Sequence, residues 1–387
     1  MLSQIDYNFY RCKAIQNRTF SYQDVQNIID SLASKNNFET IGSSFEGREI
    51  KLCKIGNGSI KILMWSQMHG DEPTATAALF DLIIFFNENN NGLCHDILKA
   101  CTLYIIPVLN PDGLEKFTRR NAQEIDINRD YLAEQSPEGK VLKKIRAELK
   151  PDFAFNLHDQ DSLYSIPKSK KQVGISLLAP AFDQTLSVNW NREQAMKVII
   201  CINETLQQLI PKQVARFNDE FEPRAFGDNF QKAGTPTILI ESGALLGDIE
   251  KQEIRKLNFF AILSALESII HQKYQEKDLM NYLMLPIQKK ELFHVLIKNC
   301  EVKIDNQKYK IDIGVNYNEV FNTEDRSLTK EYTIADLGDL RIYDGFEVIN
   351  ANELSLKANP KFDEPANFSL YNKNNKIIIG FNSGLRI

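Results

Sequence analysis

The stretch KILMWSQMHGDEP, residues 61–73, indicates how the rest of this chain is organised. Its apolar run from Ile62 to Met68 ends abruptly in the polar turn HGDEP, which is typical of a buried strand leading into a loop. The turn carries an imidazole at His69 and a carboxylate at Glu72. Nitrogen and oxygen donors suit Zn²⁺ when a third ligand comes from elsewhere. The stretch therefore predicts part of a metal site that needs a further ligand and a base.

Further apolar runs predict the remaining buried strands at residues 101–110, 152–160 and 235–243. Helix formers and helical spacing predict helices at residues 22–35, 75–87, 140–149, 191–209 and 249–274. Continuous apolar strands that alternate with helices indicate an α/β fold. We expect a three-layer αβα sandwich with a mixed, largely parallel sheet.

The segment before the opening stretch contains two shorter expected strands, at residues 38–45 and 49–56. Asn57-Gly58 is a strong hairpin signal and leads directly into the strand at 62–68. The polar segment NENNNG, residues 87–92, is expected to be a loop.

The pattern changes after about residue 275. From Leu285 to Ile387 the chain consists of short alternating runs separated by Asn, Asp and Gly, which predict a small all-β domain. We therefore divide the chain into a catalytic α/β domain at residues 1–275 and a β-rich domain at residues 276–387.

The composition excludes several classes of function. The chain has 387 residues, 43% of them apolar and 25% charged, and a net charge of −5, so it lacks the basic bias of nucleic-acid or membrane-surface binders.

The N-terminus has no signal-peptide pattern, and no apolar run approaches the ~18 residues of a membrane span. The six cysteines contain no C-x-x-C pair and indicate reduced thiols. We expect a cytoplasmic protein; the sequence does not predict its oligomeric state.

Two further residues complete the expected metal site. His158 and Glu241 lie near the ends of the strands at 152–160 and 235–243, and sites in such sheets gather at the carboxyl ends of strands. Two histidines and one carboxylate leave a fourth position open, as in catalytic zinc sites. Glu241 would then be the general base, although a salt-bridged core residue is the alternative. His95 is expected to be a solvated loop residue, and the same expectation applies to His271 and His294.

The segment FTRRNAQEIDINRD, residues 117–130, is rich in cations. It is either a solvated loop or a binding segment. An arginine beside an asparagine, Asn128-Arg129, is suited to clamp a carboxylate, and Arg119 or Arg120 could stabilise a developing oxyanion.

Taken together, these residues resemble the zinc carboxypeptidase family over roughly residues 40–270. The stretches that carry the resemblance are Phe45-Glu46-Gly47-Arg48, His69-Gly70-Asp71-Glu72-Pro73, Asn110-Pro111-Asp112-Gly113, Arg119-Arg120-Asn121, Asp126-Ile127-Asn128-Arg129, Leu157-His158 and Ile240-Glu241. The ordered set is specific, whereas HxxE alone would be weak.

The resemblance implies that His69, Glu72 and His158 bind one Zn²⁺ and that Glu241 is the base and proton shuttle. It also implies that a zinc-bound water attacks an amide carbonyl and that an amine leaves. Asp126 matches a carboxylate that orients a metal-bound histidine.

For the substrate, the resemblance implies that Arg119 stabilises the oxyanion, with Arg120 as the equivalent if the register slips by one. Asn128 and Arg129 match the pair that binds the substrate's terminal carboxylate. The implied substrate is a peptide or an N-acyl amino acid with a free carboxylate.

The chain departs from the family in one respect. Digestive-type members have a mobile tyrosine about twenty residues before the catalytic glutamate, but residues 216–234 contain none. Phe217, Phe221 and Phe226 could fill that space without donating a hydrogen bond. Candidate specificity residues nearby are Asp159, Arg224 and Lys232.

Three functions are therefore open: a zinc metallocarboxypeptidase, which the intact NPDG and RRN segments favour, an aspartoacylase-like deacylase of N-acyl amino acids, and a non-catalytic zinc-binding scaffold.

Overall fold

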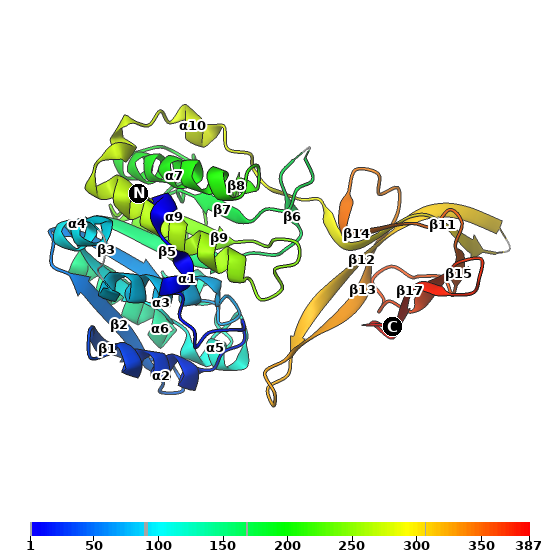
Figure 1. Cartoon of the computed structure of the whole chain (residues 1–387), viewed down its shortest axis with the longest axis horizontal. Helices are drawn as coiled ribbons and strands as arrows, with labels where there is room; N and C mark the ends of the chain where they lie inside the picture. The colour runs from blue at the N-terminus through cyan, green and yellow to red at the C-terminus, as the bar shows by residue number, and fades with distance from the viewer. Residues whose placement is uncertain (1, 89–91, 168, 306) are drawn as a thin grey trace. The chain divides into compact units, whose positions relative to one another are not determined.

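The chain forms two compact units (Figure 1). The computed structural model describes residues 2–88, 92–167, 169–305 and 307–387. The first unit comprises Met1–Ser162 and Val173–Gln288, and the second comprises Leu163–Gln172 and Lys289–Ile387. Residues 276–288, assigned above to the β-rich domain, thus belong to the first unit. The buried Tyr282 explains this, because its hydroxyl oxygen accepts a hydrogen bond from the Ala179 amide at 3.1 Å.

The described part of the first unit contains an eight-stranded sheet in the order β1-β2-β4-β3-β5-β9-β7-β8. Its strands are β1 (Asn37–Ser43), β2 (Glu49–Gly56), β3 (Ile60–Trp65), β4 (Cys101–Ile106), β5 (Phe153–Asp159), β7 (Ile175–Leu178), β8 (Val214–Arg216) and β9 (Thr237–Ser242). The central strands β4, β3, β5 and β9 run parallel, and β7 and β8 are parallel to each other. The antiparallel pairs are β1 with β2, β2 with β4, and β7 with β9. The predicted mixed, largely parallel sheet is confirmed.

Both faces of this sheet are buried under helices, as strand β3 shows. Ile62 and Met64 belong to one hydrophobic core, and the alternate residues Leu63 and Trp65 belong to another. The first core includes residues of α2 (Tyr22–Leu32), α3 (Thr74–Glu88), α4 (Gly92–Ala100), α7 (Trp190–Leu209) and α9 (Gln252–Ile270), and the second includes residues of α6 (Pro137–Leu149) and α8 (Phe226–Lys232). Because side chains alternate across a strand, this confirms the predicted layered α/β fold (Figure 1).

The remaining helical elements of this unit are short. They are η1 (Leu2–Gln4), α1 (Tyr7–Tyr10), α5 (Pro111–Lys116), η2 (Ile127–Arg129), η3 (Lys273–Glu276) and α10 (Met280–Leu283).

The prediction of a hairpin between β2 and β3 is wrong, because β4 lies between these two strands in the sheet. A different constraint explains the glycine at position 58. A Cβ atom there would lie 2.0 Å from the backbone carbon of Ala100, so only glycine permits this close approach to the start of β4.

Strand β3 also ends at Trp65 rather than Met68, because Gln67 adopts a φ of 49°. Residues 89–91 of the expected NENNNG loop lie outside the described residues.

The second unit is built from strands alone in its described residues, as the alternating pattern predicted. One sheet has the order β13-β12-β11-β14, another has the order β15-β16-β17-β18, and β10 pairs with β6. The strands are β6 (Tyr164–Ser165), β10 (Lys289–Lys290), β11 (Leu292–Ile304), β12 (Gln307–Phe321), β13 (Leu328–Gly338), β14 (Asp344–Asn350), β15 (Ser355–Lys357), β16 (Phe368–Tyr371), β17 (Ile377–Asn382) and β18 (Leu385–Arg386). Ile297 and Ile313 of the first sheet share a core with Phe368 and Phe381 of the second.

All six cysteines are buried and have free thiols, in agreement with the sequence-based expectation. Within the described residues, every helix is too short or too polar to cross a lipid bilayer.

A buried ion pair attaches the N-terminal segment to the first unit. Asp81 on α3 and Arg255 on α9 are both almost fully buried, and Arg255 Nε donates to Asp81 Oδ2 at 2.7 Å. The same carboxylate accepts hydrogen bonds from the Tyr7 hydroxyl and the Cys12 amide, each at 2.7 Å. Arg255 also donates to the carbonyl oxygen of Ile15 at 2.8 Å. The pair therefore satisfies polar groups of a segment that has little regular structure of its own.

Arg255→Met should destabilise the first unit by about 3–5 kcal/mol, because it leaves the buried Asp81 carboxylate without its counterion. Denaturant unfolding monitored for this unit gives the free energy. Lys256→Met, at the neighbouring half-buried position, is the control and should stay within about 0.5 kcal/mol of the unmodified protein. A loss below about 1 kcal/mol for Arg255→Met would show that the pair does not anchor the segment.

Candidate metal centre and substrate site

Three side chains converge where strands of the sheet end. His69 follows β3, Glu72 lies two residues before α3, and His158 is near the end of β5. Glu241 in β9 is the direct register partner of His158. Neighbouring residues in register on parallel strands point to the same face of a sheet, so the carboxylate of Glu241 belongs on the same side as the His158 imidazole.

The loop that carries His69 is braced by the start of α5. A Cβ atom on Gly70 would lie 1.9 Å from the backbone carbon of Gly113, so the two segments are in direct backbone contact. Asn110 fixes the same loop, because its amide nitrogen donates to the Met68 carbonyl at 3.2 Å while its Oδ1 accepts from the Gly113 amide at 2.9 Å. The residue types in HGDE and NPDG thus depend on each other.

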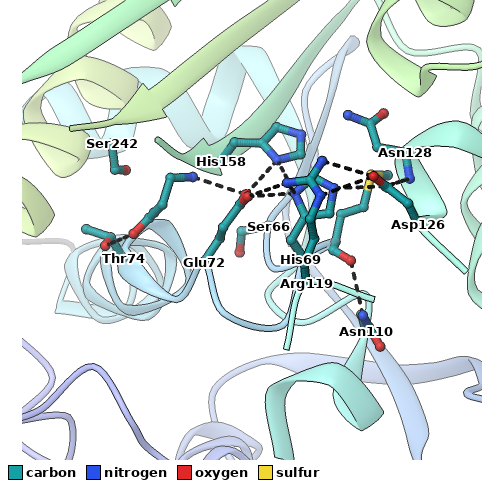
Figure 2. Close-up of polar contacts among 12 residues, drawn as sticks. Ser66, His69, Glu72, Thr74, Asn110, Arg119, Asp126, Asn128, His158 and Ser242 are labelled. Atoms are coloured by element: carbon teal, nitrogen blue, oxygen red, sulfur yellow. Dashed lines mark hydrogen bonds and ion pairs between the residues drawn. The ribbon is translucent and has the colours of Figure 1, made fainter. Parts of the chain in front are cut away.

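The potential ligand atoms of His69, Glu72 and His158 all lie within 4.8 Å of one another (Figure 2). Glu72 Oε1 is 2.7 Å from His69 Nδ1, Glu72 Oε2 is 2.8 Å from His158 Nδ1, and the two Nδ1 atoms are 3.2 Å apart. All three residues are buried. Among the described residues, this is the only group of at least three His, Cys, Asp or Glu side chains with converging ligand atoms.

This donor set fits a divalent cation better than it fits hydrogen bonds alone. When both facing Nδ1 atoms are unprotonated, they and the Glu72 carboxylate are all acceptors, so the three groups offer no hydrogen-bond donor to one another. A cation among the three groups would satisfy every donor atom at once. Two imidazoles and one carboxylate are a zinc donor set that leaves a coordination position open.

Asp126 and Arg119 support these residues from outside. Asp126 Oδ1 lies 3.1 Å from His69 Nε2, so the nitrogen that faces away from Glu72 is held by a carboxylate. Arg119 donates to Glu72 Oε1 through Nη1 at 3.2 Å and to Asp126 Oδ2 through Nε at 3.1 Å. The structure thus brings Arg119 to the candidate metal ligands. Arg120 instead donates to the carbonyl oxygen of Glu124 at 2.8 Å.

The pKa values reflect this concentration of charge. Burial raises the pKa of Glu72, but His69 and His158 outweigh that effect and hold it far below its usual range. Burial lowers the pKa of His69, yet Glu72 and the hydrogen bond to Asp126 raise it to about 9. Burial also lowers the pKa of His158, and here burial prevails. The cluster therefore contains a firmly ionised carboxylate between two imidazoles.

Glu241 has a different environment. Burial raises its pKa well above the usual value, and the charge of Glu72 adds to the shift. In the described part of the chain, the Glu241 carboxylate has no hydrogen-bonded side-chain partner. Glu241 is therefore not the salt-bridged core residue that was considered as the alternative. A carboxyl group poised to hold a proton beside the donor set is suited to proton transfer.

The Asn128-Arg129 pair lies in η2, directly after Asp126. Asn128 Oδ1 accepts from the Phe226 amide at 3.0 Å, so its NH₂ group supplies the donors available to a ligand. The Nε atom of Arg129 is 3.1 Å from Glu222 Oε2. Sequence analysis missed this partner, since nothing in the local pattern around Glu222 connects it to a residue 93 positions earlier.

The segment that lacks the tyrosine runs from β8 to α8. Phe226 is fully buried, and its ring packs against Tyr131 at a centroid distance of 5.2 Å, so it cannot occupy a substrate site. The idea that Phe226 replaces the tyrosine is therefore wrong. Phe217 and Phe221, which lie outside that core, are half-buried.

The three candidate specificity residues have different surroundings. Lys232 is exposed on α8, whereas Arg224 lines a pocket together with Arg129. Asp159 forms an ion pair with Lys251 at 3.0 Å, a partner that sequence analysis also missed. The Asp159 amide donates to Glu72 Oε2 at 3.1 Å, so this residue supports the candidate metal ligands.

Comparison with known proteins agrees with this geometry. A family model described as zinc carboxypeptidase matches residues 23–228, slightly more than half of the chain. Bacteriocin BCN5 of Clostridium perfringens is 38% identical over 25% of this chain and 12% of its own length. Carboxypeptidase B of Astacus astacus is 31% identical over 24% of this chain and 32% of its own length. The matches thus cover only a minor part of these curated relatives.

A solved structure shows the same fold. The metallo-carboxypeptidase from Burkholderia cenocepacia superposes with a TM-score of 0.54 and 15% sequence identity, over 66% of this chain and 70% of that one. At this identity the likeness concerns the fold alone.

Glu72→Gln should weaken Zn²⁺ binding by more than about 100-fold, because it removes the charged ligand itself. Loss of a residue that only contacts a ligand costs about 10–100-fold. Asp126→Asn should weaken binding by about 10–100-fold, because it only loosens the hold on His69. Competition with a chromophoric chelator measures both affinities. The exposed His271 provides the control variant His271→Ala, which should bind Zn²⁺ normally. Equal affinities for all four proteins would place the metal elsewhere.

Proposed function

The chain belongs to the zinc carboxypeptidase family, and from that premise we propose that it is a zinc-dependent carboxypeptidase, which hydrolyses the amide bond next to a free C-terminal carboxylate. The observation that carries the proposal is the convergence of His69, Glu72 and His158 directly beside the register position of Glu241. A metal site without a base would suit a scaffold equally well, but the adjacent buried carboxyl group favours hydrolysis.

We infer that the three converging side chains hold one Zn²⁺, with Asp126 keeping the His69 ring in orientation. When bound, this ion polarises the substrate carbonyl and lowers the pKa of a coordinated water toward ~7. His69 keeps Nδ1 free for the ion because Asp126 lies 3.1 Å from Nε2.

Glu241 is the proposed general base. Its raised pKa in the metal-free protein means that it holds a proton readily. A positive charge bound beside Glu72 favours the ionised form of Glu241, which then accepts a proton from the attacking water. The same carboxyl group returns that proton to the nitrogen of the departing amine.

Arg119 is the proposed oxyanion donor. Its Nη1 lies 3.2 Å from both His69 Nδ1 and Glu72 Oε1. The positive charge of Arg119 is therefore next to the side chains that would hold the ion, where negative charge would develop on the carbonyl oxygen. Asn128 and Arg129 are the proposed clamp for the substrate's terminal carboxylate, with an amide and a guanidinium as donors. Arg120 contacts the Glu124 backbone and is assigned to the wall of the substrate pocket.

Glu241→Gln should retain Zn²⁺ and lose about two or more decades of kcat, because the amide keeps the shape of the side chain but cannot accept the proton. Turnover of a peptide with a free C-terminus, together with the metal content of the same sample, measures both properties. Near-normal kcat in a zinc-loaded variant would remove Glu241 from the mechanism.

A substrate screen tests the assigned reaction. Peptides with free C-termini should be cleaved, and the same peptides with an amidated C-terminus should be cleaved at least about tenfold more slowly, because a charged hydrogen bond to Arg129 is lost. N-acyl amino acids without a peptide chain complete the panel. Equal rates on free and amidated peptides would reject the clamp, and exclusive turnover of N-acyl amino acids would identify a deacylase. Zinc binding without any turnover would identify a scaffold.

A further inference from the structure

An open pocket of about 460 Å³ adjoins the candidate metal cluster, because Asp126 lines this pocket and contacts His69 of the cluster. Three arginines line this pocket, namely Arg120, Arg129 and Arg224. Two of its acidic residues are already engaged. Asp126 contacts His69 and Arg119, and Asp130 accepts hydrogen bonds from the Ser136 amide and hydroxyl group at 2.7 and 2.6 Å. This leaves Glu124 as the acidic side chain that opposes three guanidinium groups in the pocket wall.

A carboxylate from the chain itself lies between two of these arginines. Glu222 Oε2 is 3.1 Å from Arg129 Nε and 2.8 Å from Arg224 Nη2, and Glu222 Oε1 is 2.8 Å from Arg224 Nε. Arg224 thus contacts Glu222 through a bidentate pair of hydrogen bonds, which is the geometry that guanidinium groups use to bind free carboxylates. The hydrogen bonds from Arg224 lower the pKa of Glu222 to about 2, so this carboxylate is charged at neutral pH.

The contact between Glu222 and the two arginines is exchangeable. The side chains of Arg129 and Arg224 are 38% and 55% exposed, and that of Glu222 is 27% exposed. Ion pairs at such positions contribute little to stability, because water screens them and competes for the same hydrogen bonds. A ligand that presents carboxylates to both arginines can therefore displace Glu222 without disturbing the core.

We propose that Arg224 binds a second carboxylate, carried by the side chain of the substrate's C-terminal residue, and that Glu222 occupies this position until the substrate displaces it. The inference rests on the proposed carboxypeptidase function, in which Arg129 holds the terminal carboxylate. A C-terminal dicarboxylic residue such as glutamate carries its two charges a few bonds apart, as required by two guanidinium groups that now share one carboxylate. The substrate class is therefore peptides that end in a dicarboxylic residue.

The first test compares four peptides that differ only in their last residue, which is Glu, Gln, Leu or Arg. The Glu peptide should have a kcat/KM at least about tenfold above that of the isosteric Gln peptide, since a charged hydrogen bond to Arg224 is lost in the latter. Arg224→Gln should reduce this ratio to below about threefold by raising KM for the Glu peptide with little change in kcat.

Arg341 offers a matched control, because it grips Asp339 two residues earlier with the same two-armed geometry but belongs to the second unit. Arg341→Gln should leave the Glu-to-Gln ratio unchanged. If the two variants alter the ratio equally, the effect is not specific to the pocket and the proposal fails.

Glu222→Gln distinguishes a displaced carboxylate from a structural ion pair. Removing the internal competitor should lower KM for the Glu peptide a few-fold and tighten binding of glutarate, measured by calorimetry on the zinc-loaded protein. Butyrate, which has one carboxylate, should bind more weakly than glutarate. If Glu222→Gln raises KM as Arg224→Gln does, the pair only shapes the loop and the proposal is overturned.

The two proposals fail in different ways. Turnover of all four peptides without a preference for Glu would reject the second carboxylate site and leave the carboxypeptidase function intact. Selective binding of glutarate without turnover of any peptide would reject the carboxypeptidase and leave the two-arginine site intact. Absence of both turnover and glutarate binding would reject both.

Discussion

The buried carboxylate of Glu72 is the interaction on which the arrangement of the first unit's site depends. It is contacted by His69, by Arg119, and by His158 and the amide of the adjacent Asp159, which come from three separate parts of the chain. A charge in the protein interior is tolerated only when it is paired and hydrogen-bonded, so each of these segments must be in place when the unit folds. Stability of the fold and construction of the site are therefore one requirement.

The sheet supplies the precision and the loops complete the site. Parallel pairing of β5 with β9 puts His158 and Glu241 in register, and no loop rearrangement can separate them without breaking the ladder. The loop that carries His69 has no such ladder and depends on backbone contact between Gly70 and Gly113. The NPDG segment is in turn held by Asp112, which is buried and accepts hydrogen bonds from Ser44 and Arg48 at 2.7 and 2.6 Å.

The proposed substrate half of the site is less buried than the metal half and has more freedom to change. Arg129 is partly exposed and forms an ion pair with Glu222, whereas the three proposed metal ligands are buried. Sites commonly combine a rigid scaffold with adaptable loops. In this chain, the segment without a tyrosine provides a Glu222–Arg224 pair at the pocket. In our proposal, recognition therefore depends on a substrate carboxylate replacing the carboxylate of Glu222.

The sequence by itself determined the types of the main elements and the chemistry of the metal cluster, because long apolar runs and a histidine–carboxylate turn are local signals. It did not determine strand order: Asn57-Gly58 has the local form of a hairpin turn, yet β4 lies between the strands it joins. Only the tertiary structure decided that Arg119 rather than Arg120 faces Glu72, and that Glu222 meets Arg129. These choices depend on side-chain direction and on contacts between distant segments, which a linear pattern does not contain.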